Sequence, residues 1–202
     1  MSLSELGVGG LYITLYVRHH PPVKNNSHWG LYHHEDDKAR GTEYHVKGIG
    51  QGWIANHGKS PRLHQSRYAS TRILYTTKPE THYFIKQNGV RIFSGFLFVG
   101  LMQITSIPED LKGYGVKKLR TYDNEINDRE GITCRVWLFD VLKLLQTPVD
   151  GVRILECENL GDLEQEAMDL GKKHAQAAAD NIQPRPINLS QFLLKAEPTS
   201  GI

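Results

Sequence analysis

Cys134 lies where a polar stretch of the chain changes into a strongly apolar one, and this position suits a reactive thiol. The apolar run covers residues 136–145, and the residues before the cysteine include Asn124, Asn127, Asp128 and Gly131. A thiol in the first turn of a helix faces unpaired backbone N–H groups and the positive end of the helix dipole. Both favour the thiolate, which is the nucleophilic form. Cys134 is therefore a candidate nucleophile for acyl transfer.

Two histidines far upstream are candidates for the base that such a nucleophile needs. His28 stands before Trp29 in one strand-like segment, and His45 follows Tyr44 in another. If the two segments pair as antiparallel strands, facing residues come within about 5 Å of each other. An imidazole beside a cysteine can form a thiolate–imidazolium pair, and a third polar group can fix its tautomer. The backbone N–H of Cys134 would be one oxyanion donor.

The elements that must position these residues can be predicted from local pattern. Enrichment in β-branched and aromatic residues predicts strands at 11–17, 28–32, 42–47, 71–76, 82–86 and 96–104. The Gly- and His-rich segment 48–67 lacks periodicity and is expected to be a long loop or a lid. Residues 134–146 form the clearest helix, and apolar residues nearly all round it predict a buried, central position. A second helix is expected over 163–179, with Asp162 as its N-cap. Residues 108–111 are expected to start a short helix, because Pro and acidic residues suit a first turn. Residues 152–155 are expected to form a closing strand.

Bulk composition limits the possible classes of function. The 202 residues carry a formal net charge of +2, which gives little reason to expect a nucleic-acid or anionic membrane partner. The N-terminus lacks the pattern of a signal peptide, and no segment is apolar for long enough to span a bilayer. Two cysteines do not suggest a disulfide framework. We expect a cytoplasmic protein with one α+β domain over 1–182, a Pro-containing arm over 183–202 and no stable membrane anchor.

Other residues that invite a functional interpretation have simpler explanations. Cys157 lies between two carboxylates, which would raise its pKa, and is expected to be inert. Adjacent histidines on a strand point to opposite faces, and no metal-ligand spacing occurs, so we expect neither a metal nor a cofactor. The alternate glycines of 48–52 do not open a helix, which argues against a phosphate loop. Trp53, which follows them, is expected either to line the site or only to pin the loop.

Taken together, the segments resemble the circularly permuted papain-like proteins of the NlpC/P60 and lecithin–retinol-acyltransferase type. The matching pieces lie within about residues 11–145 and are His28-Trp29-Gly30-Leu31-Tyr32, Tyr44-His45-Val46 and Thr133-Cys134-Arg135-Val136-Trp137. A set of ascomycete proteins with the same His-Trp and Cys-x-x-Trp segments is also similar. The resemblance implies an antiparallel sheet packed on a helix that begins at the nucleophile. It also implies Cys134 as nucleophile, His28 as base and acid, and His45 as the residue that orients His28.

The expected activity is acyl transfer through an acyl-thioenzyme on a small-molecule or peptide substrate, with fungal secondary metabolism as one setting. Trp29, Trp53 and Trp137 are the expected substrate-binding residues. The sequence does not identify the acyl acceptor, so the enzyme could be a hydrolase, an acyltransferase or a cyclase. It does not identify the oligomeric state either. One alternative is a ligand-binding protein in which Cys134 is an ordinary buried thiol. Another is a cyclase or isomerase that uses the His28–Cys134 pair for proton transfer without a covalent intermediate.

Overall fold

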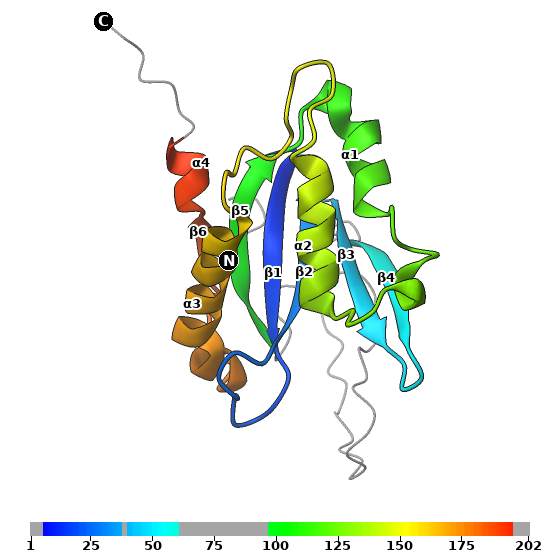
Figure 1. Ribbon diagram of the computed structural model, residues 1–202. Coiled ribbons are helices and arrows are strands. Elements are labelled where there is room, and N and C mark those ends of the chain that lie inside the picture. Colours follow the sequence, from blue (N-terminus) through cyan, green and yellow to red (C-terminus); the bar gives the residue numbers. More distant parts are fainter. Residues whose placement is uncertain (1–5, 38–39, 61–96, 196–202) are drawn as a thin grey trace, which may run out of the picture.

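A six-stranded sheet forms the centre of the molecule, as the computed structural model in Figure 1 shows. The structure describes residues 6–37, 40–60 and 97–195. The strand order is β4-β3-β2-β1-β5-β6, and every neighbouring pair is antiparallel except β5 and β6. The strands are β1 (Gly10–Val17), β2 (Ser27–His34), β3 (Gly41–Gly48), β4 (Trp53–Ser60), β5 (Phe98–Ser106) and β6 (Ile187–Leu189).

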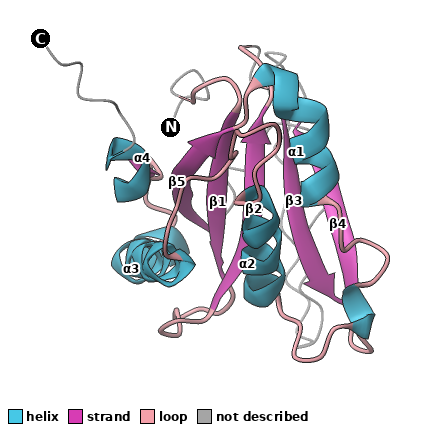
Figure 2. Cartoon of the chain, turned by 45° about the horizontal axis from the view of Figure 1, so that its top comes forward, coloured by secondary structure: helices cyan, strands magenta, loops and turns pink. Residues whose placement is uncertain are grey.

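The helices that cover the sheet pack mainly on one of its faces. Figure 2 shows α2 packed over the central strands and α3 beside the β5 side of the sheet. The helical segments are η2 (Glu109–Leu111), α1 (Lys112–Leu119), η3 (Ile126–Asp128), α2 (Cys134–Leu145), α3 (Leu160–Ala179) and α4 (Gln191–Lys195). The mixed α+β class with a largely antiparallel sheet is therefore confirmed.

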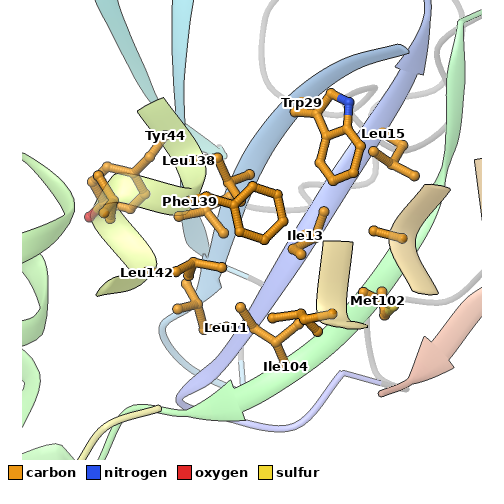
Figure 3. Close-up of a cluster of buried hydrophobic side chains, with 14 of the residues drawn as sticks. Leu11, Ile13, Leu15, Trp29, Tyr44, Met102, Ile104, Leu138, Phe139 and Leu142 are labelled. Carbon is orange, nitrogen blue, oxygen red and sulfur yellow. The ribbon is translucent and has the colours of Figure 1, made fainter. Parts of the chain in front are cut away.

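The main core lies between this face of the sheet and the helices. Alternate residues of β1, such as Leu11, Ile13 and Leu15, meet Leu138 and Phe139 of α2 there (Figure 3). The intervening residues of β1 point to the opposite face, because successive strand side chains alternate. That face holds a second, aromatic-rich cluster, formed by Leu6, Tyr12, Tyr16, Tyr32, Phe98 and Leu101. Both faces of the central strands are thus buried.

Several local predictions agree with the structure. The strands expected at 11–17, 28–32 and 42–47 are confirmed as β1, β2 and β3, and that at 96–104 corresponds to β5. The helices expected over 134–146 and 163–179 are confirmed as α2 and α3. The strands expected at 71–76 and 82–86 lie outside the described residues.

The expectation of a loop over 48–67 is wrong for residues 53–60, which form β4 and pair with β3. This segment has few β-branched residues, so its local preference for a strand is weak. The segment forms a strand because its backbone is hydrogen-bonded to β3, which outweighs its weak local preference. The effect is to bring Asn56 and His57 into the sheet beside His45.

Three further expectations need correction. Residues 152–155 do not form a strand, and only Val152 among them takes part in an isolated bridge, with Val149. The cap of α3 is Asn159, whose side chain accepts from the N–H of Gly161, so the helix begins earlier than the predicted Asp162 cap implies. Helix α2 is not buried all round, because Val136 is 40% exposed on its outer face. Its apolar residues extend past the stripe that contacts the sheet.

The segment after residue 182, expected to be an arm, contributes β6 and α4 to the fold. Arg185 is buried and donates to the carbonyls of Ala177 and Ala178 at 3.0 and 3.1 Å. It therefore adds side-chain bonds to two carbonyls at the end of α3 that also accept backbone N–H groups, Ala177 from Ile182 and Ala178 from Asn181. Within the described residues, no helix is both long and apolar enough to cross a lipid bilayer.

Candidate active site

Cys134 is the first residue of α2, and its thiol is buried at the N-terminus of that helix. The preceding Thr133 is the N-cap, and its hydroxyl accepts from the N–H of Val136 at 3.1 Å. This cap starts the helix at the cysteine, because the threonine backbone is extended. The first N–H groups of a helix have no intrahelical acceptor, so the sulfur sits where donors are free to reach it. Cys134 is only 2% exposed.

The thiol has a cationic partner that the sequence did not point to. Arg18, the residue after β1, places Nη2 2.9 Å from Cys134 Sγ. The same nitrogen lies 3.5 Å from Nδ1 of His28. The thiol and the imidazole are therefore bridged by a guanidinium. Arg18 Nε is buried and has no hydrogen-bond partner among the described residues.

His28 and His45 are in direct contact, as expected for residues of two neighbouring strands. His28 Nε2 lies 3.0 Å from His45 Nδ1, and both side chains are buried. The register pairs Leu31 with Tyr44, so the two histidines meet diagonally rather than face to face. Gly30 makes this contact possible, since a Cβ there would lie 3.2 Å from His45 Cβ.

Asn56 extends the chain of contacts by one residue. It is paired with His45 across β3 and β4, and its Nδ2 lies 2.9 Å from His45 Nε2. The polar chain thus runs from Asn56 through His45 and His28 to Arg18 and the thiol. Asn56 was missed because residues 48–67 were expected to be a loop, and the segment 53–60 shows no alternation of apolar and polar residues that would mark a strand.

The two parts of the site belong to opposite faces of the sheet. Cys134 lies in the main core with Trp29. His28 precedes Trp29 in β2 and so points the other way, where its ring lies 6.1 Å from that of Tyr16. Arg18 can bridge the two faces because β1 has just ended at Val17. The link between the thiol and the base, which runs through Arg18, therefore depends on where β1 ends.

A buried carboxyl lies on the histidine face. Tyr16 donates to Glu43 Oε1 at 2.5 Å, and both groups are buried. Burial raises the pKa of Glu43 from 4.5 to about 7, although the hydrogen bond from Tyr16 opposes this rise. Burial also lowers the pKa of His45 to about 4, with smaller contributions from His57 and Lys47. His45 is therefore neutral at physiological pH.

The three tryptophans expected to bind substrate occupy different environments. Trp137 is fully buried in the main core, and its Nε1 has no partner among the described residues. Trp29 is also buried, 5.9 Å from the ring of Phe139, but it borders a cavity of about 220 Å³ between the β1–β2 loop and α3. Trp53 is partly exposed and lines a cavity of about 580 Å³. Both its backbone N–H and C=O are bonded to the side chain of Asn127.

Burial or an acidic partner accounts for Cys157 and for His33, His34 and His57 among the other described histidines. Burial is the main cause that raises the pKa of Cys157, and the acidic groups nearby add to it. His57 donates from Nε2 to Asp123 at 2.8 Å. Burial lowers the pKa of His33 and of His34. The described part of the chain holds no cluster of three or more His, Cys, Asp or Glu residues suited to a metal.

No protein-family model, curated protein or solved structure matches the chain. The chemistry of the site therefore has to be argued from its own residues.

Proposed function

We propose that the protein is a cysteine-dependent acyl-transfer enzyme in which Cys134 attacks the carbonyl carbon of an amide, ester or thioester. The observation that carries the proposal is the 2.9 Å contact between Arg18 Nη2 and Cys134 Sγ at the start of α2. A cation and a helix N-terminus both stabilise a thiolate, which is the form that attacks carbonyl carbons. A structural cysteine in an apolar core needs neither.

In the first half-reaction, the thiolate sulfur bonds to the carbonyl carbon and the π electron pair moves to the oxygen. The backbone N–H of Cys134 and the guanidinium of Arg18, both beside the sulfur, would donate to that oxyanion. When the adduct collapses, the bond to the leaving group breaks and that group takes the electron pair. His28, carrying a proton, donates it to the leaving group, and a thioester of Cys134 remains.

In the second half-reaction, His28 takes the proton of the acceptor, which is water, an amine, an alcohol or a carbon acid. The deprotonated acceptor bonds to the thioester carbon, and the sulfur leaves as thiolate. The proton lost to the leaving group is thereby restored to His28. His45, 3.0 Å from His28, holds the imidazole in place through both steps.

The order of these residues along the chain supports a permuted papain-like arrangement, with both histidines on strands that precede the helix of the nucleophile. The cavity beside Trp53, of about 580 Å³, falls within the range that small ligands occupy. Its lining includes none of Cys134, Arg18, His28 and His45. The proposed substrate class, a small molecule or a peptide segment, and the cytoplasmic setting therefore rest on the sequence and not on this cavity.

The proposal can be tested without knowing the substrate. Iodoacetamide alkylation of Cys134 and Cys157, followed by peptide mass spectrometry from pH 4 to 10, compares two buried thiols in one protein. We expect Cys134 to react at least tenfold faster than Cys157 at pH 6, and Arg18→Gln to remove most of this advantage. His28→Ala should slow turnover more than alkylation. Equal rates for the two thiols in the folded wild type would remove the chemical basis of the proposal.

A second measurement separates the remaining alternatives. Incubation with p-nitrophenyl acetate should release a burst of p-nitrophenol and add one acetyl group to Cys134, seen by intact mass and peptide mapping. A cyclase or isomerase without a covalent intermediate would give no adduct despite a fast-reacting Cys134. A ligand-binding protein would give neither an adduct nor fast alkylation. The variant Cys157→Ser is the matched control and should behave as wild type.

A further inference from the structure

The cavity of about 220 Å³ between the β1–β2 loop and α3 lies on the same face of the sheet as Cys134. Trp29, which follows His28 in β2, lines it. Met168 of α3 lines it as well, and its Sδ lies 3.5 Å from Nη1 of Arg135, the residue after Cys134. None of the reacting groups forms its wall, but the wall includes a chain neighbour of the base and a residue in contact with a chain neighbour of the nucleophile. The cavity is therefore placed to hold a part of a molecule that does not itself react.

The wall of this cavity is apolar, and its opening is cationic. Leu15, Trp29 and Ala167 are buried in the wall. Lys24 and Lys172 also line the cavity and are exposed, and neither forms an ion pair with a described residue. The described lining residues include no carboxylate. An apolar wall beside two ammonium groups is complementary to a ligand with an apolar body and an anionic group.

Gly171 keeps this space open at a place where packing does not require a glycine. It lies in the middle of α3 and lines the cavity. A Cβ at this position would lie 3.4 Å from Leu15 Cδ1 and 3.5 Å from Ser27 Oγ, which are ordinary contact distances. Alanine would therefore fit, and it favours a helix more than glycine does. The glycine lowers the stability of the helix and leaves room between two residues of the cavity wall.

We propose that this cavity is the binding site for a small molecule that has an apolar ring or short chain and an anionic group. The apolar part lies against Leu15 and Trp29. The anionic group contacts Lys24 and Lys172 at the opening. The volume suits one ring, since a cavity of about 150 Å³ in another protein holds benzene. Binding does not depend on the proposed function, whereas the role of this molecule as the substrate of Cys134 rests on it.

The test is a ligand-observed NMR titration with 3-phenylpropionate, which has a ring and a carboxylate, and with the neutral 3-phenylpropan-1-ol. Wild type should bind the acid about threefold or more tightly than the alcohol. Lys172→Gln should reduce this difference, and Lys24→Gln with Lys172→Gln should abolish it, with binding of the alcohol unchanged. Lys173→Gln removes a charge from the next residue of α3, outside the cavity lining, and should bind both compounds as wild type does.

Gly171→Ala tests the cavity itself. It should raise the urea midpoint, because alanine favours the helix, and weaken binding of both compounds by about fivefold or more, because the methyl group fills part of the cavity. Gly113→Ala in α1, where a Cβ meets no atom within 4 Å, is the matched control and should leave binding unchanged. Wild type that binds neither compound, an acid that binds no better than the alcohol, or binding that Gly171→Ala leaves unchanged would overturn the proposal.

The binding measurement and the reactivity measurement can fail separately. Titration of Cys134→Ser should give the wild-type affinities, so a Cys134 that reacts no faster than Cys157 would remove the proposed function and leave the binding site. With a reactive Cys134, 3-phenylpropionate should slow its acetylation by p-nitrophenyl acetate in wild type but not in Gly171→Ala. Unchanged acetylation of wild type at a saturating concentration of the acid would overturn the substrate role.

Discussion

Replacing Glu43 by glutamine should change the pH dependence of stability by an amount that the structure allows to be worked out. Burial raises the pKa of this carboxyl from 4.5 to about 7. The folded state then holds the proton more tightly than the unfolded state, so stability is highest below pH 4.5 and falls as the pH rises towards 7. The full cost is about 3 kcal/mol above pH 7. Glutamine cannot ionise, yet its amide oxygen can still accept from Tyr16.

Urea unfolding followed by tryptophan fluorescence, at pH 5 and at pH 8, measures this directly. We expect Glu43→Gln to match wild type within about 1 kcal/mol at pH 5 and to exceed it by about 3 kcal/mol at pH 8. The comparison is between two proteins at each pH, so titration of His45 cancels. Glu156→Gln, at an exposed carboxylate, should show no such difference. A gap between Glu43→Gln and wild type that is the same at both pH values would refute the reasoning.

Three other substitutions test how the site and its scaffold are held. Gly30→Ala should destabilise the fold by about 1–3 kcal/mol and slow Cys134 alkylation, because the new Cβ would lie 2.7 Å from Thr14 Oγ1 and 3.2 Å from His45 Cβ; unchanged urea midpoints would contradict this. Asn127→Ala should cost about 1 kcal/mol, seen by thermal unfolding, because two bonds to the backbone of Trp53 are lost at a partly solvated position. Arg185→Met should cost about 1–3 kcal/mol by urea unfolding, since it removes the charged hydrogen bonds of a buried guanidinium to carbonyls of α3; a cost below about 1 kcal/mol would show that the backbone partners of these carbonyls and water suffice.

Much of the scaffold could be predicted from the chain because its local signals are strong. Residues 11–17 are β-branched or aromatic almost throughout, and β1 follows them closely. The change from polar to apolar sequence at Cys134 marks the start of α2, where Thr133 supplies the cap. The candidate pair of histidines also follows from local pattern, because each lies in a segment whose composition predicts a strand.

The segments that were predicted wrongly are those whose conformation depends on pairing or packing with another element more than on their own composition. Residues 53–60 look like a loop by composition and become a strand only because β3 lies beside them. The exposed side of α2 could not be identified from its apolar residues alone, because apolar residues occur all round the helix and only some of them contact the sheet. Which residues become buried depends on the apolar surface that each possible packing covers, and local propensity does not measure that surface.

The sequence by itself determined the residue types that can do chemistry here: a thiol at a helix start and two imidazoles on strands. The tertiary structure decided how they are connected. It inserted Arg18 between Cys134 and His28, because β1 ends beside the thiol, and it added Asn56 behind His45, because β4 pairs with β3. Hydrogen bonds act over about 3 Å, and that proximity comes from strand register and loop path rather than from any spacing along the chain.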